Sequence, residues 1–133
     1  LNKVVESNFI EVYPDMTLKK IVNQAIVVSK RNIFPVLDKV RQSLEGIILL
    51  DDLRPVMFNK SLYKKIKAHD LMHKPPEIID LNKDKMTVVM KKFQDTGAWN
   101  LPVLKDGKYY GFVSKSKLLT AYRRKLIQMS GKQ

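Results

Sequence analysis

A mixed α/β (α+β) fold made of two β-α-β-β-α repeats is the fold class that this sequence predicts. Three observations support it: the two halves repeat each other, apolar residues recur at helical spacing once in each half, and two apolar runs follow each of these helices. The chain has 133 residues, and 44% of them are hydrophobic, which is typical of a folded globular protein. A core of this size needs no disulfides, and the chain has no Cys.

Two prolines and two glycines make the repeat visible. The stretch RNIFPVL in the first half matches AWNLPVL in the second, so that Pro35 and Pro102 lie 67 positions apart. The next strand contains Gly46 in the first half and Gly111 in the second, 65 positions apart. A loop that is two residues longer in the first half accounts for the difference. We therefore predict two copies of one building unit that share a core.

The domain boundaries follow from the repeat. We expect the first copy at residues 1–59 and the second at residues 60–133, as one intertwined module. Each copy is expected to have an extended piece, a helix, two strands and a last helix. The extended pieces are expected at 8–12 and 77–81, the strands at 34–37, 44–50, 100–104 and 109–114, and the last helices at 51–57 and 115–129.

Apolar residues at spacings of three and four predict the first helix of each copy. These residues are Leu18, Ile21, Val22 and Ala25 in the first copy, and Met86, Val89, Met90 and Phe93 in the second. Thr17 and Asp84 are the expected N-caps, because their side-chain oxygens can accept hydrogen bonds from the free amides of the first turn.

Turn residues and one proline predict where the remaining elements begin and end. Asp106 and Gly107 supply the positive φ angles of a tight hairpin between the last two strands. Pro55 is expected to interrupt the short last helix of the first copy. The last helix of the second copy is longer, and its expected inner face consists of Leu118, Leu119, Tyr122, Leu126 and Ile127.

The charge balance indicates an anionic partner. Lys and Arg number 25 against 13 Asp and Glu, a formal net charge of +12, which attracts nucleotide phosphates, nucleic acid or an acidic membrane surface. No apolar stretch reaches the roughly 20 residues of a membrane-spanning helix. The sequence starts with Leu1 rather than Met, and we expect it to be the cytosolic piece of a longer polypeptide.

Catalytic and metal centres are not expected in this chain. The sequence has no Cys, no Gly-x-Ser-x-Gly, no phosphate-binding Gly loop and no carboxylate pair placed to split acid and base roles. His69 and His73 have the i, i+4 spacing of a helical metal pair. However, Pro75 and Pro76 end any helix there and no third ligand is evident, so no metal is expected.

Together, these elements resemble a tandem pair of CBS motifs. The resemblance rests on the Pro-Val-Leu strands, the glycine-hydrophobic-hydrophobic strands and the opening Asp70-Leu71-Met72 of the second copy, and it covers about residues 4–125. It implies two motifs that pack as a pseudo-twofold pair, with a cleft that binds adenine nucleotides in many members. The linker DLRPVMF at 52–58, followed by Asp70-Leu71-Met72, is similar to the cytoplasmic tail of bacterial ClC-type chloride channels and transporters.

The resemblance implies a site for ATP, ADP or AMP. In CBS motifs the pattern Gly-x-x-Thr/Ser-x-x-Asp places a carboxylate that accepts the two ribose hydroxyls, three residues after a hydroxyl. Here the pattern is split: the first copy has Asp52 at the carboxylate position but Leu49 at the hydroxyl position, and the second has Ser114 at the hydroxyl position but Lys117 at the carboxylate position. Because neither copy has the complete pattern, a cleft that is purely structural stays open as an alternative to nucleotide binding. The implied nucleotide contacts are Tyr13, Arg31, Asn32, Asp52, Ser114 and Lys117.

The individual roles of these residues leave alternatives open. Asp52 suits a ribose acceptor, and it equally suits an acid that interacts with the dipole of the helix. Ser114 suits a sugar contact or a plain N-cap. Arg31 would stack on adenine through its guanidinium plane, and Lys117 would meet phosphates.

The implied function is regulatory rather than catalytic. A CBS pair on the cytoplasmic face of the inner membrane, attached to a transmembrane chloride-transport domain, would modulate ion transport through homodimerisation and nucleotide binding. The basic run Arg123-Arg124-Lys125 would face anionic lipid. Two alternatives stay open, namely a basic nucleic-acid-binding module and a CBS pair that regulates another enzyme or transporter. Because the basic residues are scattered along the chain, nucleic acid is not the expected partner.

Overall fold

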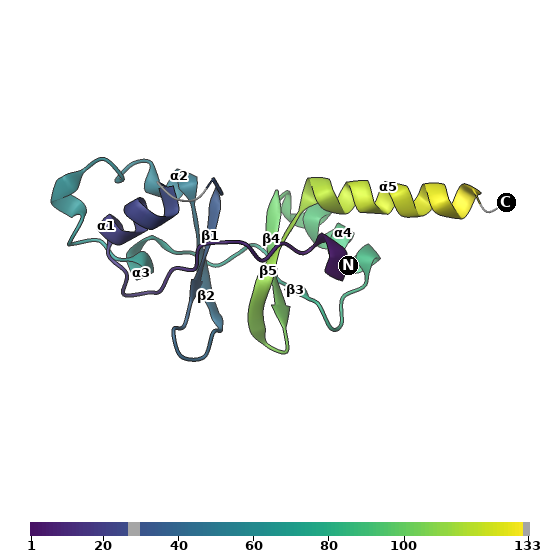
Figure 1. Ribbon diagram of the computed structural model, residues 1–133, viewed down its shortest axis with the longest axis horizontal. Helices are drawn as coiled ribbons and strands as arrows, with labels where there is room; N and C mark the ends of the chain where they lie inside the picture. Colours follow the sequence, from purple (N-terminus) through teal and green to yellow (C-terminus); the bar gives the residue numbers. More distant parts are fainter. Residues whose placement is uncertain (27–29, 132–133) are drawn as a thin grey trace. The chain divides into compact units, whose positions relative to one another are not determined.

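The computed structural model describes residues 1–26 and 30–131, and the chain forms two compact units (Figure 1). The N-unit consists of Asn8–Pro75 with Gly107–Tyr109, and the C-unit consists of Leu1–Ser7, Pro76–Asp106 and Tyr110–Gln133. Each unit is therefore completed by a segment from the other half of the sequence. The boundary between the two predicted copies, 1–59 and 60–133, describes the repeat in the sequence and stays a prediction.

The N-unit is built around a small antiparallel sheet. Its two strands are β1 (Ile33–Leu37) and β2 (Leu44–Leu49). Single bridges extend this sheet on both sides, because Val12 lies parallel to Val36 and His73 lies antiparallel to Ile47. The helical segments are α1 (Leu18–Ile21), the π-turn η2 (Val22–Ile26), α2 (Leu50–Leu53), the 3-10 turn η3 (Lys60–Leu62) and α3 (Ala68–Leu71).

The C-unit has the same plan with one more regular strand. Its elements are η1 (Asn2–Val4), β3 (Ile79–Asp80), α4 (Met86–Thr96), β4 (Asn100–Lys105), β5 (Lys108–Ser114, from Tyr110 on) and α5 (Lys115–Gly131). The sheet order is β3-β4-β5, with Ile79 parallel to Val103, and Glu6 forms an antiparallel bridge with Phe112 beyond β5. The hairpin between β4 and β5 has positive φ at Asp106 (54°), as the sequence predicts. The α+β fold class is thus confirmed.

Local chemistry explains the short helices of the N-unit. Thr17 caps α1, because its Oγ1 accepts the Lys20 N–H at 3.4 Å. The predicted α-helix through Val22 widens there into η2, and the side chain of Ala25 lies outside the described part of the chain. α2 stops before Pro55, which has no N–H to continue the helix.

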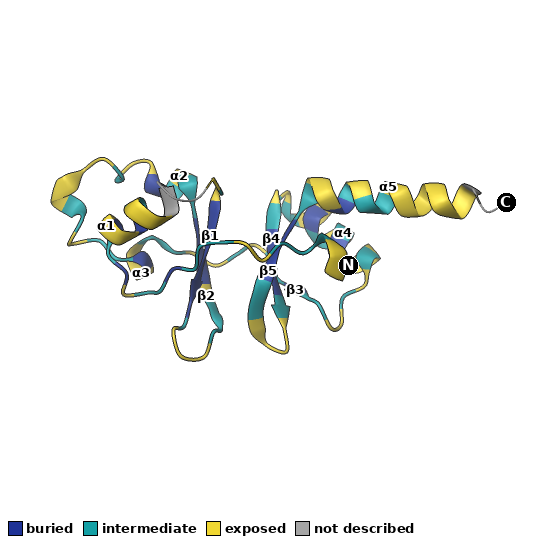
Figure 2. Ribbon diagram, viewed as in Figure 1, coloured by how far each residue is buried: buried dark blue, intermediate teal, exposed yellow. Residues whose placement is uncertain are grey.

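Each unit has its own apolar core, shown in dark blue in Figure 2. The N-unit core consists of Val12, Met16, Leu18, Ile21, Phe34, Val36, Ile48, Leu53 and Ala68. The C-unit core consists of Ile79, Val89, Phe93, Leu101, Val103, Val113 and Leu118. No buried polar side chain occurs among the described residues, so burial of apolar surface is the main stabilising term in both units. None of the helices in the described ranges is long and apolar enough to cross a bilayer.

The second half of α5 differs from the predicted inner face. Leu118 is buried and Leu119 and Tyr122 are half-buried, but Leu126 and Ile127 are 46% and 70% exposed. A helix of 17 residues is about 25 Å long, which exceeds the length of a strand of six or seven residues. The last turns therefore leave the C-unit core, as the yellow end of α5 in Figure 2 shows.

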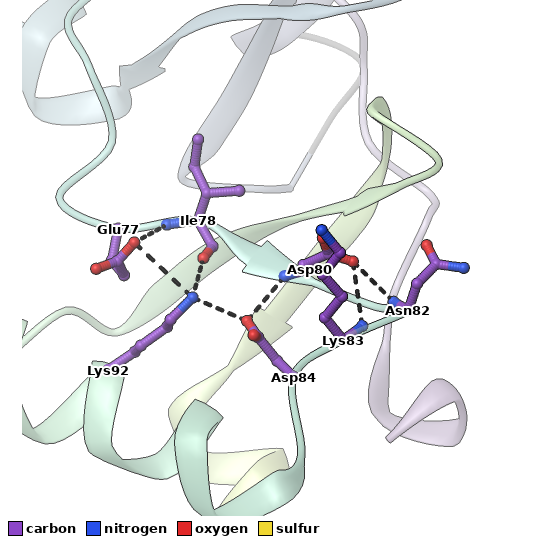
Figure 3. A network of polar contacts seen from close by, with 7 residues as sticks. All are labelled: Glu77, Ile78, Asp80, Asn82, Lys83, Asp84 and Lys92. Atoms are coloured by element: carbon purple, nitrogen blue, oxygen red, sulfur yellow. Dashed lines mark hydrogen bonds and ion pairs between the residues drawn. The ribbon is translucent and has the colours of Figure 1, made fainter.

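Asp84 is not the N-cap of α4, contrary to the sequence prediction. The helix begins one residue later, with Lys85 at the N-cap position. The Asp84 carboxylate instead accepts the backbone N–H of Asp80 at 2.9 Å and the Nζ of Lys92 at 2.8 Å (Figure 3). Lys92 also donates to the carbonyl oxygen of Ile78 at 2.7 Å. This network ties α4 to the segment that enters β3.

The network lowers the pKa of Asp84. Burial raises this pKa, but the hydrogen bonds from Lys92 and from the Asp80 amide together lower it by more. The net pKa therefore lies below its usual value. Since the pKa of Asp84 is lower in the native chain than in the unfolded chain, the ionised carboxylate stabilises the fold fully above the unfolded pKa. This contribution to the free energy of unfolding is lost as the pH falls below about 4, through the native pKa.

Asp84→Asn should lower the free energy of unfolding at pH 7 by about 1–2 kcal/mol, because a charge-assisted hydrogen bond is lost. Urea denaturation between pH 7 and pH 2 measures this, and the difference from the unmodified chain should shrink toward zero at acidic pH. Asp95→Asn is the matched control, since Asp95 forms an exposed pair with Lys91 (3.3 Å) on the same helix and should cost less than about 0.5 kcal/mol. Equal losses in both variants would contradict the role of Asp84.

Candidate functional site

Asp52 lies in the first turn of α2, at the end of β2. Its Oδ2 accepts the backbone N–H of Leu49 at 2.8 Å, which closes the start of the helix. The simpler role of a first-turn acid is therefore present in the structure. The side chain is 30% exposed, so part of the carboxylate faces solvent and is accessible to a ligand.

His73 is the second partner of the Asp52 carboxylate. Its Nε2 lies 2.9 Å from Oδ2 of Asp52, and its Nδ1 lies 3.2 Å from the carbonyl oxygen of Lys74. The backbone of His73 is held by Ile47, with N–H to carbonyl bonds of 2.9 and 3.0 Å in the two directions. The segment after α3 thus places an imidazole next to the predicted ribose acceptor.

Gly46 allows this segment to approach β2. A Cβ at position 46 would lie 3.0 Å from the carbonyl oxygen of His73 and 3.3 Å from the Cβ of Met72. Contacts this short are tighter than packed side chains normally make. The glycine that the repeat singled out therefore serves a close backbone approach rather than a turn.

The C-unit has an equivalent pair, in which the helix carries an ammonium and the incoming segment carries a carboxylate. Ser114 Oγ accepts the Lys117 N–H at 3.2 Å, which is the geometry of an N-cap. The Nζ of Lys117 forms an ion pair with the carboxylate of Glu6. Glu6 in turn exchanges two backbone hydrogen bonds of 2.8 Å with Phe112.

Gly111 is even more restricted than its counterpart in the first half. A Cβ at position 111 would lie 2.3 Å from the carbonyl oxygen of Glu6 and 2.9 Å from Cγ1 of Val5. No side chain fits at that distance from a backbone oxygen, so any larger residue would displace residues 5 and 6.

The two side-chain pairs, His73 with Asp52 and Lys117 with Glu6, occupy equivalent positions of the repeat. Glu6 and His73 are 67 positions apart, and Asp52 and Lys117 are 65 positions apart, the two offsets found in the sequence. In the N-unit the helix carries the carboxylate and the incoming segment carries the imidazole. In the C-unit the helix carries the ammonium and the incoming segment carries the carboxylate.

The other predicted contacts fall in the N-unit. The carbonyl oxygen of Asn32 accepts the Leu50 N–H at 2.8 Å, so Asn32 and Asp52 lie at the same end of the sheet. The guanidinium of Arg31 lies 4.4 Å from the ring centre of Phe9, a cation–π contact.

Tyr13 packs against the N-unit core, with the Nζ of Lys39 at 5.8 Å from its ring centre. Tyr109 is a further aromatic group of this unit, near Arg31 and Glu11. Burial raises the pKa of the Tyr109 hydroxyl well above its usual range, and the negative charge of Glu11 raises it further, whereas Arg31 acts in the opposite direction. The hydroxyl is therefore neutral at physiological pH.

The sequence reasoning missed Glu6 and His73 as members of the site. The signal was present, because both residues stand at the 67-residue offset of the repeat. His73 was instead considered with His69 as a metal pair, but His69 pairs with Asp70 at 3.1 Å. No cluster of three potential metal ligands occurs in the ranges 1–26 and 30–131.

A basic hollow also lies in the N-unit. Its volume is about 500 Å3, and its lining consists of Lys19, Lys60, Ser61, Tyr63, Lys64 and Lys65. None of the predicted nucleotide contacts lines this hollow. It is open to solvent and adds four ammonium groups to the surface of this unit.

Two comparisons relate the chain to known proteins. Residues 68–124 match the family model of the CBS domain, which confirms the resemblance for most of the second half. The fold of the whole chain is that of solved CBS-pair proteins. No curated protein matches the chain by sequence.

Three of these solved structures are complexes with adenine nucleotides. CbpB in complex with c-di-AMP is 16% identical, with a TM-score of 0.75 over 100% of this chain and 90% of that chain. CBSX2 in complex with AMP is 22% identical, with a TM-score of 0.73 over 92% and 94%. The CBS domain of the bacterial CNNM/CorC family Mg2+ transporter in complex with ATP is 14% identical, with a TM-score of 0.74 over 88% and 82%.

Proposed function

We propose that this chain is a regulatory CBS-pair module that binds an adenine nucleotide in its N-unit, with Asp52 as the ribose acceptor, and that it has no catalysis of its own. The observation that carries the proposal is the partly exposed Asp52 carboxylate at the start of α2. The proposal is supported by three proteins of the same fold that are in complex with c-di-AMP, AMP and ATP.

The chemistry of the N-unit suits adenosine better than that of the C-unit. An ionised carboxylate accepts hydrogen bonds from ribose hydroxyls, whereas an ammonium only donates. Asp52 therefore offers what a sugar needs, and Lys117, at the equivalent position, does not. Arg31 adds a flat guanidinium that stacks on a base or binds a phosphate. Tyr13 and Asn32 complete the proposed N-unit contacts. In the C-unit, taken by itself, Ser114 would act as a helix cap and Lys117 as a phosphate contact.

Regulation would arise through a shift between conformations. A bound nucleotide favours one arrangement of the module only as far as it binds that arrangement more tightly.

We propose that the module acts as a homodimer on the cytoplasmic face of a membrane, as the tail of a ClC-type chloride channel or transporter. The linker at 52–58 and the segment Asp70-Leu71-Met72 support that parent. The run Arg123-Arg124-Lys125 would interact with anionic lipid.

Asp52→Asn should weaken the binding of ATP, ADP, AMP and adenosine about tenfold or more, because an amide replaces a charged acceptor of the ribose hydroxyls. Isothermal titration calorimetry with each ligand measures this effect. Asp51→Asn is the matched control: Asp51 is adjacent, exposed and paired with Arg54, and its replacement should leave the affinity unchanged.

The pattern over the four ligands tests the assignment further. If the sugar is the recognised group, adenosine should lose as much affinity as ATP in the Asp52→Asn variant. No heat and no thermal shift at millimolar nucleotide would contradict nucleotide binding. Equal effects of the two substitutions would contradict the role of Asp52.

Nucleic-acid binding is the second candidate, and the basic hollow in the N-unit favours it. The net charge of +12 should attract duplex or single-stranded nucleic acid at low salt through counterion release. For a nucleotide-regulated module, a gel mobility shift should disappear at physiological salt. A shift that persists there, and that weakens when Lys60 and Lys64 are replaced by Gln, would favour the nucleic-acid function instead.

A further inference from the structure

One oxygen of the Asp52 carboxylate is already saturated. Oδ2 accepts the Leu49 N–H at 2.8 Å and contacts the His73 Nε2 at 2.9 Å. A carboxylate oxygen has about two lone-pair positions, so these two donors occupy both of them. Oδ1 is then the oxygen that is left for a ligand hydroxyl.

A ribose and a carboxylate interact best through two hydrogen bonds. The 2′- and 3′-hydroxyls have a fixed spacing, and each can donate to one oxygen of the same carboxylate. With His73 on Oδ2, the arrangement with one hydroxyl on each carboxylate oxygen is blocked, and only Oδ1 is open to the ribose. A hydroxyl can bind Oδ2 only if the imidazole leaves.

The imidazole is held beside Asp52 by its backbone and by both ring nitrogens. Its backbone is held by two hydrogen bonds to Ile47, which do not involve the side chain. The ring is 43% exposed, so a ligand can approach it from solvent. Its Nε2 faces the Asp52 carboxylate and its Nδ1 faces the Lys74 carbonyl oxygen.

We infer that His73 sets the sugar selectivity of the nucleotide site, because its ring occupies the carboxylate oxygen that the second ribose hydroxyl requires. The inference rests on the proposed function, in which Asp52 is the ribose acceptor. The unmodified chain then binds ribonucleotides and 2′-deoxyribonucleotides with similar affinity. Removal of the imidazole frees Oδ2, and the site distinguishes the two sugars.

The C-unit provides an internal comparison. At the equivalent position Lys117 presents an ammonium, which is paired with Glu6. An ammonium donates to hydroxyls or phosphates but cannot accept both hydroxyls of a diol. The inferred sugar selectivity is therefore a property of the N-unit alone, and substitutions at Lys117 should not change it.

The experiment compares ATP with 2′-deoxy-ATP by calorimetry in four versions of the chain. In His73→Ala the preference for ATP over 2′-deoxy-ATP should rise about tenfold relative to the unmodified chain, which is the effect of one charge-assisted hydrogen bond. In His73→Gln the amide can again donate to Oδ2, and the preference should stay near that of the unmodified chain. His69→Ala is the matched control and should change nothing, since His69 pairs with the exposed Asp70.

The outcomes separate the inference from the proposed function. If both nucleotides bind and the preference is the same in His73→Ala as in the unmodified chain, the inference is wrong while the nucleotide site stands. If no version binds either nucleotide, both are wrong. Binding of ATP by His73→Ala but not by the unmodified chain would contradict the inference, which requires the unmodified chain to bind both nucleotides.

A second readout needs no substitution and covers a variant that fails to fold. The chain has two histidines, so NMR signals of the His73 ring can be told apart from those of His69. Saturating ATP should shift the His73 ring signals strongly and leave those of His69 in place. Unchanged His73 signals in the ATP-bound chain would overturn the inference.

Discussion

The close approach of a backbone segment to each glycine strand is the constraint on which the rest of the structure depends. At Gly111 the carbonyl oxygen of Glu6 occupies the place of a Cβ, and at Gly46 the carbonyl oxygen of His73 comes almost as close. Each approach is fixed by a pair of backbone hydrogen bonds, to Phe112 and to Ile47. Because backbone bonds hold the segments, the side chains that they carry arrive at the helix starts in a defined register.

Those side chains decide what each helix start can bind. The same backbone geometry delivers a carboxylate to Lys117 in one unit and an imidazole to Asp52 in the other. The two copies thus keep one fold, although the helix start carries a carboxylate in one copy and an ammonium in the other. This divergence fits a general rule that fold is set by packing and backbone pairing, whereas function is set by a few side chains placed on it.

The repeat in the sequence was sufficient to predict the fold class and the strands. The Thr17 cap and the hairpin turn at Asp106 were predictable because they depend on local residue order. Asp84 was mispredicted because a partner eight residues further on, Lys92, competes for its carboxylate. The exposed Ile127 was mispredicted because periodicity shows which face of a helix is apolar, but not where the core beneath it ends.

The candidate site was only half visible in the sequence. Asp52 and Ser114 stand within a short local pattern, and their capping contacts follow from it. Glu6 and His73 reach the site from 111 and 21 positions away from their partners, and no local pattern predicts such pairs. Glu6 and His73 become recognisable only when residues outside the motifs are also compared at the 67-residue spacing of the repeat.

Amide hydrogen exchange at the two glycine strands tests the central claim most directly. If the incoming segments complete the units, the amides of Glu6 and Phe112 should be protected as strongly as those of the central strand β4, and the amides of Ile47 and His73 as strongly as those of β1. Exchange of Glu6 and His73 at the rate of an unstructured peptide, while β4 and β1 remain protected, would contradict the account.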